Sequence, residues 1–274
     1  MPERPMLVAW VMLFALSASG QDSVSSSSIG GGFSGSAHFG PAPRISRPVT
    51  GAPYSGELVT ENVQTLADGT HITRTMPPTK EYRDSFGRTR TERPMFRQLV
   101  NRGEKAPDAP TVVEIVDPVA QVRYTLDTQK KVAHKQALVP MSPPSSRPLR
   151  PHASPGGAAG HPAAGQSPAS TTEKLEPQTI EGLPAVGTRR TTTWPEGAVG
   201  NDRPITAVSE TWMSPELQAP LLTRNADPRF GEHTEKLIGI SRAEPDASLF
   251  QPPVDYTVVD EKEDFTITWG AGSQ

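Results

Sequence analysis

The pattern of apolar and polar positions along the chain predicts short β-strands and few helices. Residues 58–63 and 71–76 are β-prone runs separated by Ala67-Asp68-Gly69, and a turn of this kind between two such runs is typical of a β-hairpin. After the first twenty residues, no stretch repeats apolar residues at the spacing of three and four that an amphipathic helix requires. The chain is therefore predicted to be mainly β.

Two segments are predicted to fold, residues 54–138 and residues 172–260. The first contains the hairpin and a three-stranded meander at residues 112–116, 122–126 and 132–134, with Asp-Pro and Asp-Thr-Gln-Lys as its turns. The second has further candidate strands at residues 188–194, 205–213, 221–223 and 232–240. Neither segment closes a core alone, so we expect one antiparallel sheet or curved half-barrel. Two small separate domains are the alternative.

The first twenty residues are predicted to be an export signal. Arg4 precedes an apolar run at residues 6–16, and the small residues Ala18 and Gly20 occupy the positions expected before a cleavage site. An uncleaved anchor is the alternative. A signal at residues 1–20 places the rest of the chain in the periplasm or outside the cell.

Three other segments are predicted to stay outside the folded part. Residues 21–53 and 139–171 are rich in Ser, Gly, Pro and Ala, so ordering them would cost more conformational entropy than their burial returns. We interpret the first as a disordered leader and the second as a flexible linker or loop insertion. Residues 261–274, with Glu261, Glu263 and Asp264, are interpreted as a solvated tail.

The composition narrows the possible functions. The chain has no Cys, which excludes disulfides and a cysteine-linked lipid anchor. No later segment reaches the roughly 20 apolar residues of a membrane-spanning helix, so no transmembrane segment is predicted in the mature chain. The net charge of −3 argues against nucleic acid as a partner, which would favour a strongly basic protein.

No motif predicts catalysis or a cofactor. The glycines from Gly30 to Gly35 match a dinucleotide-binding pattern, but the strand before it and the helix after it are missing. His71, His134 and His233 could converge in space, yet no histidine pair has the short helical spacing used in zinc sites, and each is predicted to lie on a sheet face. We therefore predict no catalytic, cofactor-binding or metal-binding residues, no cofactor and no enzymatic activity.

Two further features carry specific predictions. From Lys80 to Lys105 there are eight basic and four acidic residues. Alternation places Arg88 and Arg90 on one sheet face, interpreted as a water-facing strand that resists edge aggregation, with contact to an anionic surface as the alternative. Trp212 stands just before Ser214-Pro215 and is predicted to anchor the core at the end of a strand. Its alternative role is to line an open concavity.

Several motifs also carry a family resemblance. They include Gly51-Ala52-Pro53-Tyr54-Ser55, Tyr82-Arg83-Asp84-Ser85-Phe86-Gly87, Trp212-Met213-Ser214-Pro215-Glu216-Leu217, Asp227-Pro228-Arg229 and Pro252-Pro253-Val254-Asp255-Tyr256. In this order they resemble a family of uncharacterised exported proteins of environmental Gram-negative bacteria. More distantly, the chain is similar to periplasmic lipoprotein-carrier proteins. That similarity implies a curved half-barrel whose lid helices cover a cavity for acyl chains, but clear amphipathic lid helices are missing here.

These observations predict an exported, non-enzymatic β protein that binds a partner or associates with the envelope. The first alternative is a carrier or sensor of lipid or another apolar ligand in a half-barrel cavity. The second is an enzyme whose site is assembled from distant strands. The partner is not identified by the sequence, with lipid or an envelope component as the candidates.

Overall fold

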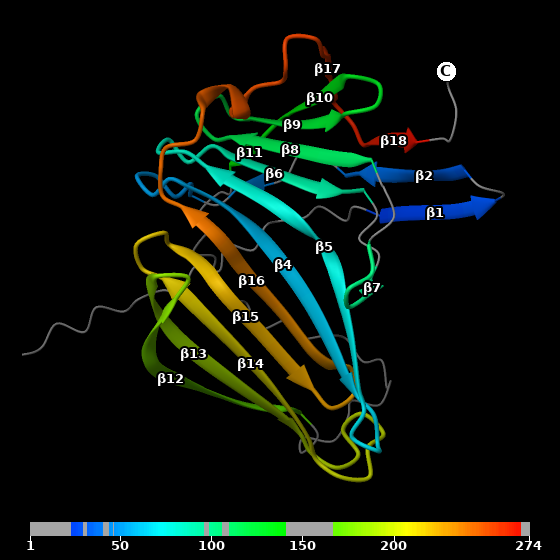
Figure 1. Ribbon diagram of the computed structural model, residues 1–274, viewed down its shortest axis with the longest axis vertical. Helices are drawn as coiled ribbons and strands as arrows, with labels where there is room; N and C mark the ends of the chain where they lie inside the picture. The colour runs from blue at the N-terminus through cyan, green and yellow to red at the C-terminus, as the bar shows by residue number, and fades with distance from the viewer. Residues whose placement is uncertain are drawn as a thin grey trace, which may run out of the picture.

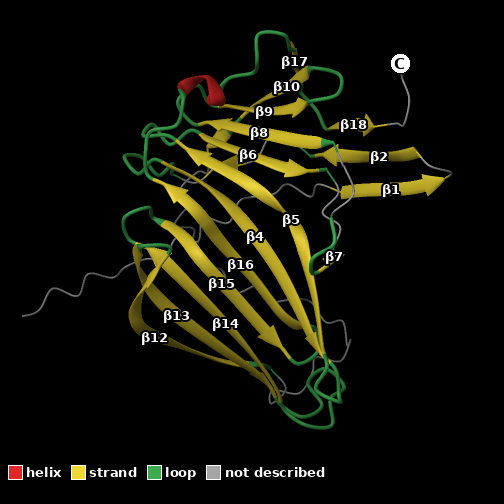
Figure 2. Ribbon diagram, viewed as in Figure 1, coloured by secondary structure: helices red, strands yellow, loops and turns green. Residues whose placement is uncertain are grey.

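The computed structural model describes residues 23–29, 32–40, 44–45, 47–95, 99–105, 110–140 and 167–269. They form β-strands and one short 3₁₀ helix, η1 (Ala247–Phe250) (Figures 1 and 2). The predicted β class with few helices is confirmed for this part of the chain. The predicted signal at residues 1–20, the glycine motif's first two residues and most of the predicted linker lie outside the described residues.

A 13-stranded sheet runs through both predicted segments. The first segment supplies β4 (Tyr54–Thr65), β5 (His71–Arg83), β6 (Thr89–Pro94), β7 (Val100–Asn101), β8 (Thr111–Asp117), β9 (Val122–Asp127) and β10 (Val132–Ala137). The second supplies β12 (Ala169–Ile180), β13 (Leu183–Trp194), β14 (Ile205–Ser214), β15 (Ala219–Asp227), β16 (Gly231–Ser241) and β17 (Thr257–Asp260). The strand order is β12-β13-β14-β15-β16-β4-β5-β6-β8-β9-β10-β17, and β7 pairs with β5.

The two segments share this one sheet because β16 pairs with β4 along most of its length, from Glu232 opposite Val63 to Ser241 opposite Ser55. Neighbouring strands are antiparallel except β10 and β17, which are parallel. The sheet curves strongly (Figure 1), and its terminal strands β12 and β17 are not neighbours. It is therefore an open, curved sheet rather than a closed barrel, as predicted.

The upper part of the sheet in Figure 1 is covered on both faces. On one face, Val113, Ile115, Leu126 and Ala133 pack against Phe250 of η1. On the other, Val112 joins a cluster with a small sheet of β1 (Ser23–Ile29), β2 (Gly32–Phe39) and β18 (Phe265–Trp269). β9 is consequently buried along nearly its whole length. A short parallel pair, β3 (Arg44–Ile45) with β11 (Val139–Pro140), lies apart from these sheets.

The small sheet differs from what the sequence predicted at both ends of the chain. β1 and β2 lie in the predicted disordered leader, and β18 lies in the predicted solvated tail. The reason is a pairing between segments more than 200 residues apart, with Phe39 opposite Phe265. Both rings are buried and stacked at 5.0 Å between centroids. β12 likewise begins at Ala169, inside the predicted linker.

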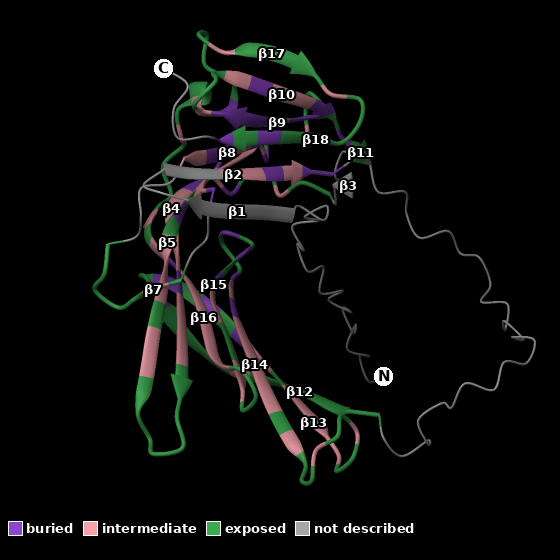
Figure 3. Ribbon diagram, turned by 90° about the vertical axis from the view of Figure 1, so that its right-hand side faces the viewer, coloured by how far each residue is buried: buried purple, intermediate pink, exposed green. Residues whose placement is uncertain are grey.

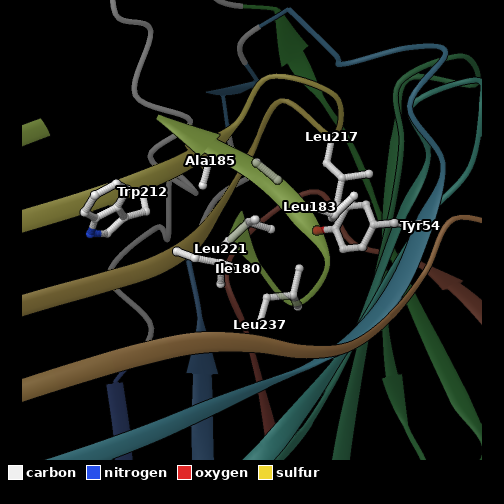
Figure 4. Packing of buried hydrophobic residues seen from close by; sticks show 9 residues of the cluster. Tyr54, Ile180, Leu183, Ala185, Trp212, Leu217, Leu221 and Leu237 are labelled. Carbon is white, nitrogen blue, oxygen red and sulfur yellow. The ribbon is translucent and has the colours of Figure 1, made fainter. Parts of the chain in front are cut away.

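The third core cluster lies where β12–β16 meet β4 (Figure 4). It contains the buried Trp212, which is 8% exposed, and the prediction that this residue is buried in the core is confirmed. Beyond this cluster the side chains of the sheet are less buried. No residue is buried in the open half, defined as residues 61–65, 71–76, 188–194, 205–211, 222–227 and 231–236 (Figure 3).

Candidate functional site

Arg83 is a buried cation at the junction of the two segments. Its Nε and Nη2 donate to the carbonyl oxygen of Ala52 at 2.9 and 2.8 Å, and Nη2 also donates to the carbonyl oxygen of Leu217 in the β14–β15 turn. The guanidinium lies 4.7 Å from the centroid of the Tyr54 ring, and burial lowers its pKa. Arg83 thus holds the segment before β4 and a turn of the second segment to β5.

Glu81, a carboxyl group with a raised pKa, lies next to this cation on the same strand. Its Oε2 accepts a hydrogen bond from the Tyr54 hydroxyl at 3.1 Å. Burial raises the pKa of Glu81 above its usual range, even though the Tyr54 hydrogen bond and Arg83 act in the opposite direction. Burial, followed by the charge of Glu81, raises the pKa of Tyr54 as well. A carboxyl group with a shifted pKa often marks a functional site. Here, however, Glu81 and Arg83 both contact Tyr54, and Arg83 also binds backbone carbonyl oxygens.

His134 belongs to a second polar cluster, beneath the small sheet. Its ring stacks on Phe265 at 4.4 Å between centroids, and Nδ1 lies 2.7 Å from Oε1 of Glu261. Nearby, buried Arg123 donates to Oε1 of Gln136, whose Nε2 donates to the carbonyl oxygen of Gly40 at 3.2 Å. Like the Arg83 cluster, this one joins segments of the fold to the sheet. Glu261 is therefore part of the structure and does not belong to a free tail.

The three singled-out histidines do not form one site. His134 lies on β10, separated by the strands β6, β8 and β9 from β5, which carries His71. His71 Nδ1 pairs with Oγ1 of Thr65, and His233 Nδ1 lies 2.9 Å from Oδ1 of Asn62. Among the described residues, no group of three or more potential ligands could hold a metal ion. Likewise, no helix in the described part of the chain is long and apolar enough to cross a membrane.

The interpretation of Arg88 and Arg90 as a water-facing pair was wrong. Arg88 forms an ion pair with buried Asp84 and lies 5.2 Å from the centroid of the Phe250 ring. Arg90 donates to Glu92 and, through Nη1, to the carbonyl oxygen of Leu249 at 3.0 Å. Both guanidinium groups are used to hold η1 and its neighbours against the sheet. An anionic surface would have to break these contacts to reach them.

The open half of the sheet carries a different arrangement, which we call the polar row. It consists of Ser209, Asn225, His233, Asn62 and Arg74, one residue on each of five neighbouring strands, and each is directly opposite the next. Residues directly opposite in a sheet share a face, so the five side chains form one line of hydroxyl, amide, imidazole and guanidinium groups. Their backbones are fixed by strand pairing on both sides.

The opposite face carries an ion-pair ladder, consisting of Glu173, Arg189, Glu210, Arg224 and Glu232. Arg189 lies 3.0 Å from Glu173 and 2.7 Å from Glu210, and Arg224 lies 2.6 Å from Glu232. Adjacent residues of a strand point to opposite faces, so Glu210, Arg224 and Glu232 face away from their row neighbours Ser209, Asn225 and His233. Each charge of the ladder has a partner within the sheet.

The face of the polar row, in contrast, has an excess of positive charge. By register and alternation it carries Lys174, Arg190 and Arg74, against Glu235, while Asp227 is neutralised by Arg229 at 2.7 Å. Arg190 contacts the hydroxyl of Ser170, a neutral group, at 3.3 Å. Arg74 is exposed and has no hydrogen bond or ion pair to a described side chain. Among the described residues, its guanidinium therefore has no acidic partner.

Apolar side chains are interspersed on the same face. Ile72 and Met76 flank Arg74 at two-residue spacing on β5, and Ile205 stands opposite Trp194 at the other side of the open half. All four are partly exposed. A surface that combines hydrogen-bonding, basic and half-buried apolar groups can bind a partner. No serine, histidine and carboxylate in the open half form the hydrogen-bonded chain that a nucleophilic site needs.

The polar row was missed at the sequence level, although a signal for it existed. Ser209, Asn225 and His233 lie in or beside strands that were predicted, but their alignment depends on the register between strands far apart in the chain. His233 was singled out only as a possible metal ligand, and Asn62 and Arg74 were not singled out at all. The alternation of hydroxyl and amide residues with charged residues along each strand could have marked two polar faces.

Comparison with known proteins assigns no family, because no family model and no curated protein matches the chain. Distant structural similarity is found to the MucA/MucB complex of Pseudomonas aeruginosa, at 13% identity and TM-score 0.35, over 76% of this chain and 58% of the matched chain. It also extends to an uncharacterized conserved protein from Thermus thermophilus, at 8% identity and TM-score 0.36, over 77% and 91% of the two chains.

A third similar structure is a putative outer membrane lipoprotein-sorting protein domain from Vibrio parahaemolyticus, at 8% identity and TM-score 0.19, over 72% and 89% of the two chains. This chain spans less than two thirds of the matched chain in the MucA/MucB complex. These similarities concern sheet architecture alone, so the functional argument rests on the residues of this chain.

Proposed function

We propose that this protein is an exported, non-enzymatic binding module that takes a partner on the polar-row face of its open half. The observation that carries the proposal is the difference between the two faces there. Five charged residues on one face are paired in the ladder, whereas the other face has an excess of basic groups and keeps at Arg74 a guanidinium with no ion pair to a described side chain. A sheet normally buries at least one face against another layer, and no described residue of the open half is buried.

The charge excess indicates the chemistry of the partner. Lys174, Arg190 and Arg74 would attract acidic groups, and Ser209 and Asn225 would form hydrogen bonds with polar ones. Because these side chains are exposed, their electrostatic contribution is screened by salt. The account therefore favours an acidic envelope component whose binding weakens as ionic strength rises.

A charge-reversal comparison tests this proposal. The intact protein, Arg74→Glu and Arg47→Glu would each be immobilised and exposed to solubilised envelope from the native cells. Arg47 is exposed and lies before β4, outside the open half, so its variant changes the net charge equally. The proposal predicts a salt-sensitive bound component that Arg74→Glu loses and Arg47→Glu retains. Equal retention by both variants would contradict it.

A carrier of an apolar ligand is the second candidate, supported by the half-buried Ile72, Met76, Ile205 and Trp194 on the polar-row face. A fatty acid bound there would quench Trp194 fluorescence, and the quenching would be insensitive to salt and to Arg74→Glu. Trp212 would not respond, because it is buried in the core cluster. The response of Trp194 alone therefore separates the two candidates.

A further inference from the structure

The outer edge of β12 is an open sheet edge. β12 is the terminal strand of the 13-stranded sheet and pairs only with β13 among the described strands. Its residues are exposed from Ala169 to Lys174. The unpaired N–H and C=O groups along such an edge can pair with another strand, and proteins commonly block them with charged side chains, prolines, bulges or short strands.

Only half of this edge is blocked. Between Leu175 and Gln178 the pairing with β13 shifts by a bulge, and Pro177 lies in that stretch. The opposite edge of the sheet is formed by β17, which is only four residues long. From Ala169 to Leu175, however, β12 pairs with β13 in seven consecutive regular steps and contains no proline. Among the described residues, this stretch keeps seven edge positions without a proline or a bulge, and Glu173 and Lys174 are its only charged residues.

We propose that the edge 169–175 of β12 pairs with the same edge of a second copy of this chain, antiparallel and centred on Thr172. A two-fold axis perpendicular to the sheet at Thr172 reverses the order of the stretch, and this register alone matches all seven regular residues. It sets Thr172 against Thr172, Glu173 against Thr171, Lys174 against Ser170 and Leu175 against Ala169. No two like charges are directly opposite.

Registers shifted towards the bulge are less favourable. A two-fold axis at Glu173 or Lys174 would place two carboxylates or two ammonium groups directly opposite, which is destabilising. It would also bring Pro177 or the bulge closer to the paired region. With the axis at Thr172, the two Glu173 side chains are only diagonal neighbours, and each is already held by its own Arg189 at 3.0 Å.

The pairing has a consequence for the open half. A two-fold axis perpendicular to the sheet keeps each face on its own side, so the polar-row faces of the two copies would form one continuous surface. The pairing depends only on the geometry and charges of β12, and it needs no partner on that surface. Seven pairs form a small contact, so the dimer should dissociate on dilution.

A charge-complementation experiment tests the axis position. Analytical ultracentrifugation would compare the intact protein, Thr172→Lys, Thr172→Asp and an equimolar mixture of the two variants. The intact protein is expected to approach twice the monomer mass as concentration rises. Each variant alone should stay monomeric because like charges meet at the axis, and the mixture should dimerise again because Lys meets Asp.

Control variants at the other edge complete the design. Thr257 is exposed on β17, so Thr257→Lys and Thr257→Asp should dimerise like the intact protein. Circular dichroism would confirm that the Thr172 variants keep the fold, as expected for an exposed position. The proposal is overturned if the intact protein stays monomeric, if either Thr172 variant dimerises like the intact protein, or if the mixture fails to dimerise.

Discussion

The indole of Trp212 lies directly over Gly187, its partner across strands β13 and β14. A Cβ atom at position 187 would stand 2.6 Å from Cζ3 of Trp212, closer than any real contact allows. The glycine leaves room for the indole, and the indole shields the glycine backbone from water. The two residues therefore form a matched pair at the end of the core cluster.

This pairing predicts non-additive effects on stability. Trp212→Ala should lower the free energy of unfolding by about 3–5 kcal/mol. Gly187→Ala should lower it by about 1–3 kcal/mol, because the ring has to move. In the Trp212→Ala background, however, Gly187→Ala should cost almost nothing, since the obstructing ring is gone. Denaturant unfolding of the four proteins measures the coupling, and additive effects would contradict the close contact.

Arg83 provides a second stability prediction. Arg83→Met removes the donors to the carbonyl oxygens of Ala52 and Leu217, and each buried carbonyl left unsatisfied costs about 1–3 kcal/mol. The matched control is Arg74→Met on the same strand, because Arg74 is exposed and should change stability by less than about 0.5 kcal/mol. Chemical denaturation would compare the two. A similar small effect of both variants would remove Arg83 from its role at the junction.

Glu81 predicts a dependence of stability on pH. Its pKa is raised in the folded state by burial, so ionisation disfavours the folded state as pH rises above the ordinary carboxyl pKa of about 4.3. Glu81→Gln keeps an acceptor for the Tyr54 hydroxyl and removes this penalty. The variant should be more stable than the intact protein at pH 7, and the difference should shrink towards zero below about pH 4, where the carboxyl is protonated in both states.

Unfolding free energies measured from about pH 4 to about pH 8 would test the sign. Two results would contradict the burial argument. One is a variant that is less stable than the intact protein at pH 7, and the other is a difference in stability that does not change with pH.

Export remains a prediction from the sequence. Cleavage after Gly20 would leave a mature chain that begins at Gln21. N-terminal sequencing of the protein from periplasmic and extracellular fractions should find this residue or one close to it. Intact Met1 in the membrane fraction would instead indicate an uncleaved anchor.

The sequence predicted the elements whose signals are local. Ala67-Asp68-Gly69 marks the turn between β4 and β5, and the meander around Asp117-Pro118 corresponds to β8, β9 and β10. The strands 188–194, 205–213 and 232–240 also lie within strands of the structure. In each of these cases, turn residues and β-prone runs stand next to each other in the chain, so short-range chemistry is sufficient.

Long-range pairing could not be predicted in the same way. β2 was hidden in a Ser- and Gly-rich segment, and its partner β18 lies at the other end of the chain. The alternation of Phe265, Ile267 and Trp269 was nevertheless a readable strand signal. Arg90 was misjudged because its acceptor, the carbonyl oxygen of Leu249, is 159 positions away. The polar row depends on the register of five strands, which neither composition nor local spacing fixes.

The claim that the polar-row face binds the partner is tested most directly by crosslinking at two adjacent residues of β15. Asn225 belongs to the polar row, and Arg224 belongs to the ion-pair ladder on the opposite face. A photo-reactive residue would be introduced at each position, and the protein would be irradiated in intact native cells. The account predicts a crosslinked product from position 225 and none from position 224. Equal products from both positions, or a product from position 224 alone, would contradict it.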